Sequence, residues 1–179
     1  MRTSMVAVLL GLSLAGAVAT PATGASAPIV PTNLTKLLNV NSDKCADVEA
    51  WSLENGAAVH QWSCRHDNAK NQQWTFARSK SDPRYWNVVN FNSTKCLDIE
   101  GPSYADGAKV HQWECYGGAS QDWSVENVGG GTDEFKLVNR YSGKCMDVEG
   151  ASKDDGARIH QWTCRDVNNG NQRWKFYTD

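Results

Sequence analysis

The sequence lacks the charge and hydropathy features that mark two large classes of protein. It has no excess of basic residues, because 18 Lys and Arg stand against 20 Asp and Glu. That balance argues against an electrostatic nucleic-acid binder and against a polybasic membrane-surface protein. Beyond the N-terminal segment, no apolar run approaches the length of a membrane span. We therefore expect no nucleic-acid partner and no membrane insertion.

The sequence also lacks the common motifs of catalysis and metal binding. It contains no G-x-S-x-G, no H-E-x-x-H and no C-x-x-C motif. A His stands four residues before Cys64, Cys115 and Cys164, but the long spacing between successive cysteines disfavours a zinc site. The acidic residues recur symmetrically and form no single differentiated acid/base pair. We expect a protein that is not an enzyme and that holds no metal and no cofactor.

The N-terminal segment has the pattern of an export signal. Arg2 supplies a positive charge, residues 5–18 are apolar or small, and small-residue cleavage sites end at Ala19 and at Ala25. We expect residues 1–27 to be a signal peptide and leader that is cleaved near one of these two positions. A retained anchor helix is the alternative, although the run is short for a span. An exported chain is secreted into an oxidising space, where disulfides persist.

Tryptophan and cysteine are abundant, with 8 Trp and 6 Cys, and most of them belong to one pattern that occurs three times. Each copy contains Lys-Cys-x-Asp, an Asn-Gly or Asp-Gly pair, His-Gln-Trp-x-Cys and a closing Gln-x-Trp. The period is about 50 residues. We expect one domain over residues 33–179, with repeats of about 34–80, 84–127 and 134–179.

The elements within each repeat are strand-sized. Apolar runs such as 37–40 and 88–91 are short, the Asn-Gly and Asp-Gly pairs are typical of tight turns, and no window has a sustained helical period. These features predict four short strands per repeat and twelve in all. Because one such unit cannot bury its own apolar face, the three repeats must share one core in a closed, all-β architecture.

The six cysteines follow the same threefold pattern. The two Cys of each repeat are 19 residues apart. Six Cys allow many pairings, but repetition favours pairing inside each repeat, because one local geometry then serves three times. We expect one disulfide per repeat, each stabilising the fold by roughly 3 kcal/mol in the chain-entropy model. The predicted pairs are Cys45 with Cys64, Cys96 with Cys115, and Cys145 with Cys164.

Together, the threefold Cys-x-Asp, Trp-x-Cys and Gln-x-Trp motifs resemble the ricin B-chain lectins and the family 13 carbohydrate-binding modules. The resemblance covers roughly residues 33–179. It implies a β-trefoil, which is a six-stranded barrel capped by three hairpins, with up to three shallow sugar sites called α, β and γ. It also implies a secreted lectin, expected to be a monomer, that binds galactose-type glycans or plant polysaccharides.

The resemblance assigns site residues to each repeat. The family uses an Asp after the first Cys, an aromatic residue two before the second Cys, and an Asn-Gln pair at the closing motif, with a further polar residue beside the ligand. Carried over, the α site comprises Asp47, His60, Trp62, Asn71 and Gln72, the β site Asp98, His111, Trp113 and Gln121, and the γ site Asp147, His160, Trp162, Asn171 and Gln172. A pyranose face stacks on such an aromatic ring, and Asp and Asn hydrogen-bond its hydroxyls.

Structural roles compete with these assignments. The Asp residues could stabilise turns, and the closing Gln residues could satisfy backbone groups. The closing tryptophans, Trp74, Trp123 and Trp174, are expected in the core. The alternative function is a trefoil module that binds or inhibits a protein and has no sugar site.

His-Gln-Trp departs from the family's usual Gln-Leu-aromatic pattern, which leaves two registers open. Either the first Trp set points outward while Gln61 and its equivalents are hydrogen-bonded inside, or those Trp side chains pack inward. We expect the outward register. The β repeat is shorter between Cys115 and Gln121 and has Ser120 in place of Asn, so we expect its site to be weaker or lost. Trp51 and Tyr104 are expected to add side walls to the α and β sites.

Overall fold

A computed structural model describes residues 29–129, 132–166 and 169–178. The expected signal peptide and leader lie outside these residues. The twelve expected strands are present: β1 Lys36–Asn39, β2 Lys44–Val48, β3 Val59–Ser63, β4 Trp74–Arg78, β5 Trp86–Asn90, β6 Cys96–Ile99, β7 Val110–Trp113, β8 Trp123–Asn127, β9 Phe135–Asn139, β10 Cys145–Val148, β11 Ile159–Trp162 and β12 Trp174–Tyr177.

Five three-residue 3₁₀ helices accompany the strands, and the sequence patterns did not predict them. They are η1 Glu49–Trp51, η2 Lys70–Gln72, η3 Ala119–Gln121, η4 Glu149–Ala151 and η5 Gly170–Gln172. No helix in the described part of the chain has the length and apolar character needed to cross a membrane.

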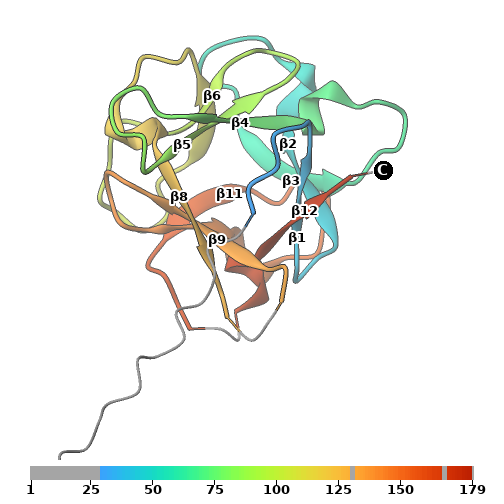
Figure 1. The fold of residues 1–179 in the computed structure, drawn as a ribbon. Helices are drawn as coiled ribbons and strands as arrows, with labels where there is room; N and C mark the ends of the chain where they lie inside the picture. The colour runs from blue at the N-terminus through green and yellow to red at the C-terminus, as the bar shows by residue number, and fades with distance from the viewer. Residues whose placement is uncertain (1–28, 130–131, 167–168, 179) are drawn as a thin grey trace, which may run out of the picture.

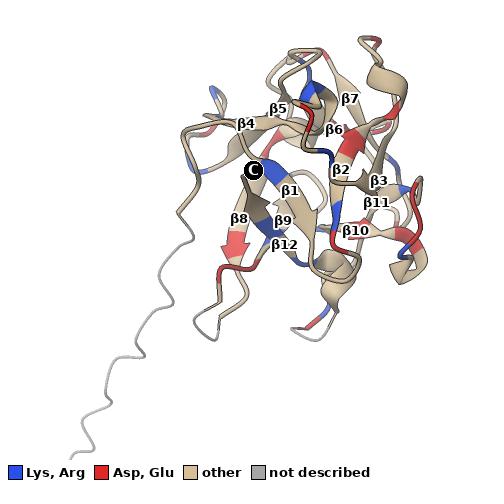
Figure 2. Ribbon diagram, turned by 90° about the vertical axis from the view of Figure 1, so that its right-hand side faces the viewer, with Lys and Arg blue, Asp and Glu red and all other residues tan. Residues whose placement is uncertain are grey.

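The strands form a β-trefoil (Figure 1), as expected. β1 pairs with β12, β4 with β5, and β8 with β9 to build a six-stranded barrel. The barrel closes where the backbones of Thr35 and Trp74 exchange hydrogen bonds of 3.0 and 2.8 Å. The hairpins β2–β3, β6–β7 and β10–β11 form the cap. In Figure 2 the basic and acidic segments are interspersed over the visible part of the ribbon.

The closing tryptophans fill the shared core, which confirms their expected structural role. Trp74, Trp123 and Trp174 are fully buried. Each indole Nε1 donates a hydrogen bond of 3.0–3.1 Å to a backbone carbonyl in the Cys-x-Asp strand of its own repeat, at Ala46, Leu97 and Met146 respectively. The three large side chains therefore bury their rings without leaving a polar N–H unpaired.

The cap hairpins settle the register of His-Gln-Trp. On β3, Val59 and Gln61 are fully buried, while Trp62 is 40% exposed. Gln61 accepts a 2.7 Å hydrogen bond from Ser42 Oγ and donates to the carbonyls of Ser152 and Asp154 at 3.0 and 2.9 Å. The outward register for Trp is therefore correct, and the buried Gln is hydrogen-bonded inside.

This buried glutamine links each repeat to the next. Gln112 donates to the carbonyls of Ser52 and Glu54, and Gln161 to those of Ser103 and Ala105, all at 2.8–2.9 Å. The glutamine of the α repeat thus binds the turn of the γ repeat. In the same way, the glutamine of the β repeat binds the turn of the α repeat, and that of the γ repeat binds the turn of the β repeat. The turns that these glutamines bind end in Gly56, Gly107 and Gly156, whose φ values of 81–84° favour glycine.

Each repeat also carries the expected disulfide. The bonds join Cys45 to Cys64, Cys96 to Cys115, and Cys145 to Cys164. Each bond ties the Cys-x-Asp strand to the end of its hairpin partner. The Asp and the outward Trp of one repeat are therefore held on the same braced hairpin.

Two of the three junctions between repeats contain an ion pair. Lys44 Nζ lies 2.7 Å from Asp155, and Lys144 Nζ lies 2.7 Å from Asp106. Desolvation alone would raise the pKa of each Asp. The hydrogen bonds from Lys and from Ser63 or Thr163 outweigh it and hold both pKa values below the ordinary one. At the third junction a neutral residue, Asn55, takes the place of the Asp, and its Oδ1 accepts a hydrogen bond from the Glu114 N–H.

Replacing Gln161 by Ala should lower the free energy of unfolding by about 3 kcal/mol. The change removes three hydrogen bonds, each contributing about 1 kcal/mol, and leaves two turn carbonyls and the Ser142 hydroxyl without their partner. Urea unfolding followed by Trp fluorescence measures the loss. Lys153→Ala, at an exposed position of a cap loop, is the control and should change stability by less than about 0.5 kcal/mol. Equal stability of the two variants would contradict a stabilising role for the three hydrogen bonds of Gln161.

Acid should weaken the two charged junctions. Because folding lowers the pKa of Asp106 and Asp155, their stabilisation is complete above the ordinary value near 3.8 and is lost as pH falls through the lower folded-state value. The double variant Asp106→Asn, Asp155→Asn should therefore lose less stability between pH 5 and about 3 than the wild type. Urea unfolding at a series of pH values tests this, and parallel pH curves for the two proteins would exclude it.

Candidate functional site

Each repeat brings its predicted residues to the wall of one surface cavity. The Asp comes from the first cap strand, the His and Trp from the second, and the Asn-Gln or Ser-Gln pair from the closing 3₁₀ helix. The α cavity measures about 230 Å³, the β cavity about 310 Å³ and the γ cavity about 440 Å³. The closing Gln residues lie behind the cavities and are fully buried.

In the α site, a buried carboxylate gathers three side chains. Asp47 Oδ1 accepts a hydrogen bond from Asn71 Nδ2 at 2.9 Å and lies 3.2 Å from His60 Nε2. Asp47 Oδ2 accepts from Gln72 Nε2 at 2.9 Å. Asn71 Oδ1 is buried and has no hydrogen-bond partner among the described residues. Three side chains therefore orient the carboxylate, and the amide oxygen of Asn71 has hydrogen-bonding capacity that the described residues do not use.

The γ site repeats this arrangement. Asp147 accepts from Asn171 Nδ2 at 2.9 Å and from Gln172 Nε2 at 2.8 Å, and its Oδ1 lies 3.1 Å from His160 Nε2. Here the buried atom without a partner among the described residues is His160 Nδ1. A buried polar atom without a partner is unusual in folded proteins. Such an atom beside an open cavity is suited to a ligand hydroxyl.

The β site keeps the carboxylate but has lost two of its partners. Gln121 Nε2 donates to Asp98 Oδ2 at 3.0 Å, whereas Asp98 Oδ1 is buried without a partner in the described part of the chain. Ser120, which replaces Asn, is 2.7 Å from the Tyr116 hydroxyl instead. The β site is therefore open and carries a free carboxylate oxygen, but it lacks the amide of the other two sites.

The closing glutamines serve both of the roles that the sequence left open. Gln72 Nε2 donates to Asp47 and also to the Ser63 carbonyl at 3.1 Å, and Gln72 Oε1 accepts from the Arg65 N–H at 2.9 Å. Gln121 and Gln172 make the corresponding bonds. They bind backbone groups and orient the site carboxylate. The three Asp residues lie within strands and accept hydrogen bonds from side chains of the closing 3₁₀ helices.

The first Trp set forms the outer wall of each cavity. Trp62 and Trp113 are 40% and 37% exposed, and each ring stacks on the His of its own strand at 5.3–5.5 Å, as Trp162 does. Each indole also packs against a turn glycine of another repeat, namely the turn that the buried glutamine of its own strand binds. A Cβ built on Gly156 would lie 3.7 Å from Trp62. Each indole is therefore positioned by its neighbours and still presents aromatic surface to solvent.

Among the wall residues that sequence reasoning missed, one occupies the same position in every repeat, directly after the second Cys. Arg65 lines the α cavity, Tyr116 the β cavity and Arg165 the γ cavity. Their common position in the repeat is the signal that could have identified them. This position puts a cation at the α and γ sites and a phenol at the β site.

The loop aromatics behave differently from one another. Trp51 lines the α cavity, as expected. Tyr104 does not line the β cavity, where Pro102 occupies the wall instead, and it stacks on Tyr141 at 4.5 Å between ring centroids. The expected Tyr104 side wall is therefore wrong, because Tyr104 stands two residues further along the loop than the cavity reaches.

No group of three or more His, Cys, Asp or Glu side chains able to hold a metal ion occurs among the described residues. The site chemistry is that of hydrogen bonding and aromatic contact. Acidic oxygens, amides, imidazoles and exposed indoles suit a neutral, hydroxyl-rich ligand with an apolar face.

Comparison with known proteins agrees with this chemistry. The model of the ricin-type β-trefoil lectin domain-like family matches residues 29–113, 70–162 and 119–179. The designed threefold-symmetric protein ThreeFoil is 37% identical, with a TM-score of 0.73 over 81% of this chain and 98% of the designed one. No match was found among curated proteins.

Two natural structures are also similar. The exo-β-1,3-galactanase 1,3Gal43A from Clostridium thermocellum is 34% identical, with a TM-score of 0.72 over 83% of this chain, which spans only 31% of the galactanase. The Macrolepiota procera ricin B-like lectin in complex with lactose has the same fold, with 20% identity and a TM-score of 0.67 over 83% of this chain and 96% of the lectin.

His111 should titrate below the ordinary His value. Burial lowers the pKa of His111, and the nearby Asp98 and Glu100 only partly oppose that shift. An NMR titration of the imidazole protons should therefore give a midpoint below about 6.5. Because folding disfavours the charged form, His111 makes stability decrease as pH falls from about 6.5 through the folded-state value. His111→Gln identifies the signal, and a midpoint at or above 6.5 would exclude the burial effect.

Proposed function

This chain belongs to the ricin-type β-trefoil lectin domain-like family, and from that premise we propose that it is a secreted, non-catalytic lectin whose α and γ sites bind glycans. The observation that carries the proposal is that buried polar atoms without partners belong to residues that line the same cavities as an exposed indole at the α site and a half-exposed one at the γ site. A pyranose has hydroxyls that satisfy such atoms and an apolar face that covers the ring.

The α and γ sites are favoured over the β site by their amides. Asn71 and Asn171 each donate to the site carboxylate, so their side chains are oriented before a ligand arrives. At the β site the hydroxyl of Ser120 is engaged with Tyr116. The β site therefore binds more weakly in this proposal, although Asp98 Oδ1 remains an acceptor for a ligand hydroxyl.

Galactose-type glycans are the proposed ligand class, with plant polysaccharides such as xylan as the second choice. The similarity to part of an exo-β-1,3-galactanase supports the first. Shallow sites of this kind bind monosaccharides with Kd on the order of millimolar. Two or three sites on one rigid body gain affinity on a polymer through effective concentration. In this proposal residues 1–27 direct export, which is consistent with three disulfides.

Replacing both site asparagines by Ser should abolish most of the binding. Ser is the residue that the β repeat carries at this position, so Asn71→Ser and Asn171→Ser are compatible with the fold. Each change removes a prepositioned hydrogen bond and should weaken its site about tenfold. Retention on immobilised galactose and xylan, together with calorimetric titration of soluble oligosaccharides, measures the effect.

The matched control for that double variant is Lys153→Ala, which leaves both cavities unchanged. Unchanged retention of the double variant would show that the asparagines do not bind glycan. If the wild type itself binds neither polymer nor any glycan on an array, the lectin proposal fails and a protein-binding trefoil takes its place.

A further inference from the structure

The α and γ sites differ at two neighbouring loop positions. Ala50 and Trp51 of the α loop correspond to Gly150 and Ala151 of the γ loop, and all four residues have φ values of 50–62°. An Asn from another repeat binds each loop, with Asn92 Nδ2 donating to the Trp51 carbonyl at 3.1 Å and Asn41 Nδ2 to the Ala151 carbonyl at 2.8 Å. The two backbones are therefore alike, and the difference lies in the indole that the α loop adds.

This indole gives the α cavity a second aromatic wall. Trp51 and Trp62 both line the cavity, and each is 40% exposed. The γ cavity has Ala151 and Trp162 at the same two positions, and its volume is about 440 Å³ against 230 Å³ for α. The narrower cavity thus has an indole at the position where the wider one has a methyl group.

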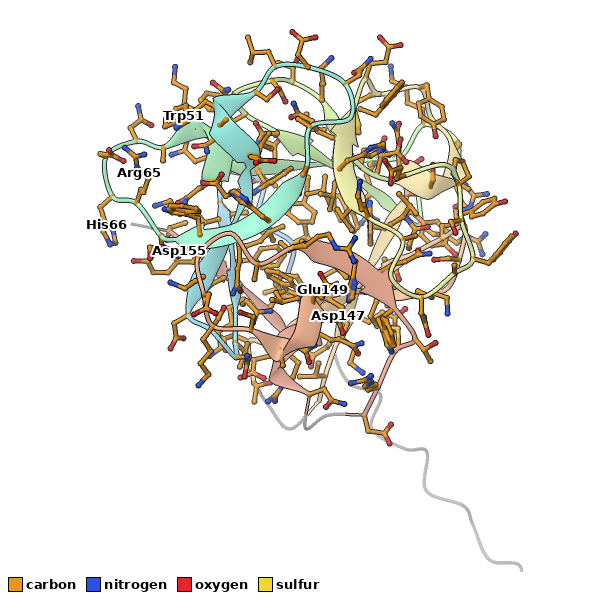
Figure 3. The ribbon with its side chains drawn as sticks, turned by 180° about the vertical axis from the view of Figure 1, so that it is seen from behind. Trp51, Arg65, His66, Asp147, Glu149 and Asp155 are labelled. Atoms are coloured by element: carbon orange, nitrogen blue, oxygen red, sulfur yellow. A yellow bond between two sulfur atoms is a disulfide. The ribbon has the colours of Figure 1, made fainter. Side chains whose placement is uncertain are left out.

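The neighbouring arginine lies against a different ring in the two sites. The Arg65 guanidinium is 5.6 Å from the Trp51 ring centroid and forms a bidentate pair with Asp67. The equivalent Arg165 lies 5.7 Å from the ring of Trp162, which is the platform of its own site and is only half-exposed. In Figure 3, Trp51 and Arg65 lie together on one flank, apart from Asp147 and Glu149 of the γ repeat. The α platform is therefore left uncovered.

We propose that Trp51 makes the α site selective for pyranosides with all ring substituents equatorial, in the gluco or xylo configuration, while the γ site accepts galactosides as readily. This inference rests on the proposed glycan binding. An all-equatorial pyranose carries axial C–H groups on both faces, so it can meet two indoles at once. Galactose has an axial hydroxyl at C4, so one of its faces is polar.

The second wall discriminates because it removes water from the second face of the ring. A C–H face gains from contact with the indole, whereas a hydroxyl pressed against it loses a hydrogen bond to water and finds no replacement. Asp47 and Asn71 also line the cavity, where their polar atoms are available to hydroxyls at the rim of the ring. The γ site lacks this wall, since Ala151 is too short to reach a sugar that lies on Trp162.

The test measures the two sites separately in the intact domain. The indole N–H signals of Trp62 and Trp162, assigned by single Trp→Phe variants, are followed by NMR while methyl β-xyloside, methyl β-glucoside or methyl β-galactoside is added. In the wild type, Trp62 should respond at lower concentrations of xyloside and glucoside than of galactoside. Trp51→Ala should weaken the response of Trp62 to xyloside about tenfold and its response to galactoside little.

The chain supplies matched controls for this test. Ala151→Trp should give the γ site the preference that Trp51→Ala removes from α. Leu53→Lys changes an exposed residue of the same loop to its γ equivalent, Lys153, and should leave both responses unchanged. Both Trp51→Ala and Leu53→Lys install residues that the γ loop already accommodates, so the fold is kept.

The possible failures are distinct. If the wild-type indoles respond to sugars but Trp51→Ala affects xyloside and galactoside equally, or affects neither, the selectivity inference is wrong and the lectin proposal stands. If neither Trp62 nor Trp162 responds to any of the three glycosides at up to several hundred times the protein concentration and on polymers, both proposals fall.

Discussion

The fold depends on a buried amide at each junction between repeats. Gln61, Gln112 and Gln161 are fully buried, and each bonds to two carbonyls of a neighbouring turn and to a hydroxyl of its own repeat. A buried amide without partners would be costly, so the three hairpins are stable only when all three repeats meet. Apolar burial brings the repeats together, and the amides select one arrangement of the cap.

That arrangement determines which side chains face solvent. Because alternate residues of a strand point to opposite sides, fixing Gln61 inward places His60 and Trp62 outward on the face that also carries Asp47. The turn that Gln61 binds then packs, through Gly156, against the outward indole of Trp62. The site therefore depends on the junction between repeats, because its aromatic wall packs against a turn of another repeat.

The sequence predicted those parts of the structure that repeat. Strand number, disulfide pairing and the core position of Trp74 and its equivalents all follow from matched positions, because three copies of one unit must solve the same packing problem. Two of the partners of Gln61 were not predictable, since they are backbone carbonyls about 90 residues away and a carbonyl is present at every position of a sequence. The short 3₁₀ helices and the roles of Arg65 and Tyr104 escaped for a related reason. They depend on loop conformation, which the strand periodicity does not encode.

The sites differ in side chains beside the junctions, while the residues that form the junctions are shared. Every repeat has the buried Gln, the site Asp and the turn Gly. Position 51 and its equivalents, by contrast, carry Trp, Pro and Ala. In the α loop, Ala50 and Trp51 both adopt left-handed backbone, which costs a non-glycine residue roughly 1–2 kcal/mol. The γ loop needs one such residue fewer, because Gly150 takes the first position. The α loop is therefore the more strained of two otherwise equivalent loops, and the added side chain is an indole that lines the cavity. Strain of this kind persists where the surroundings hold it, here through the Asn92 hydrogen bond and the Arg65 contact, and it commonly marks a functional position.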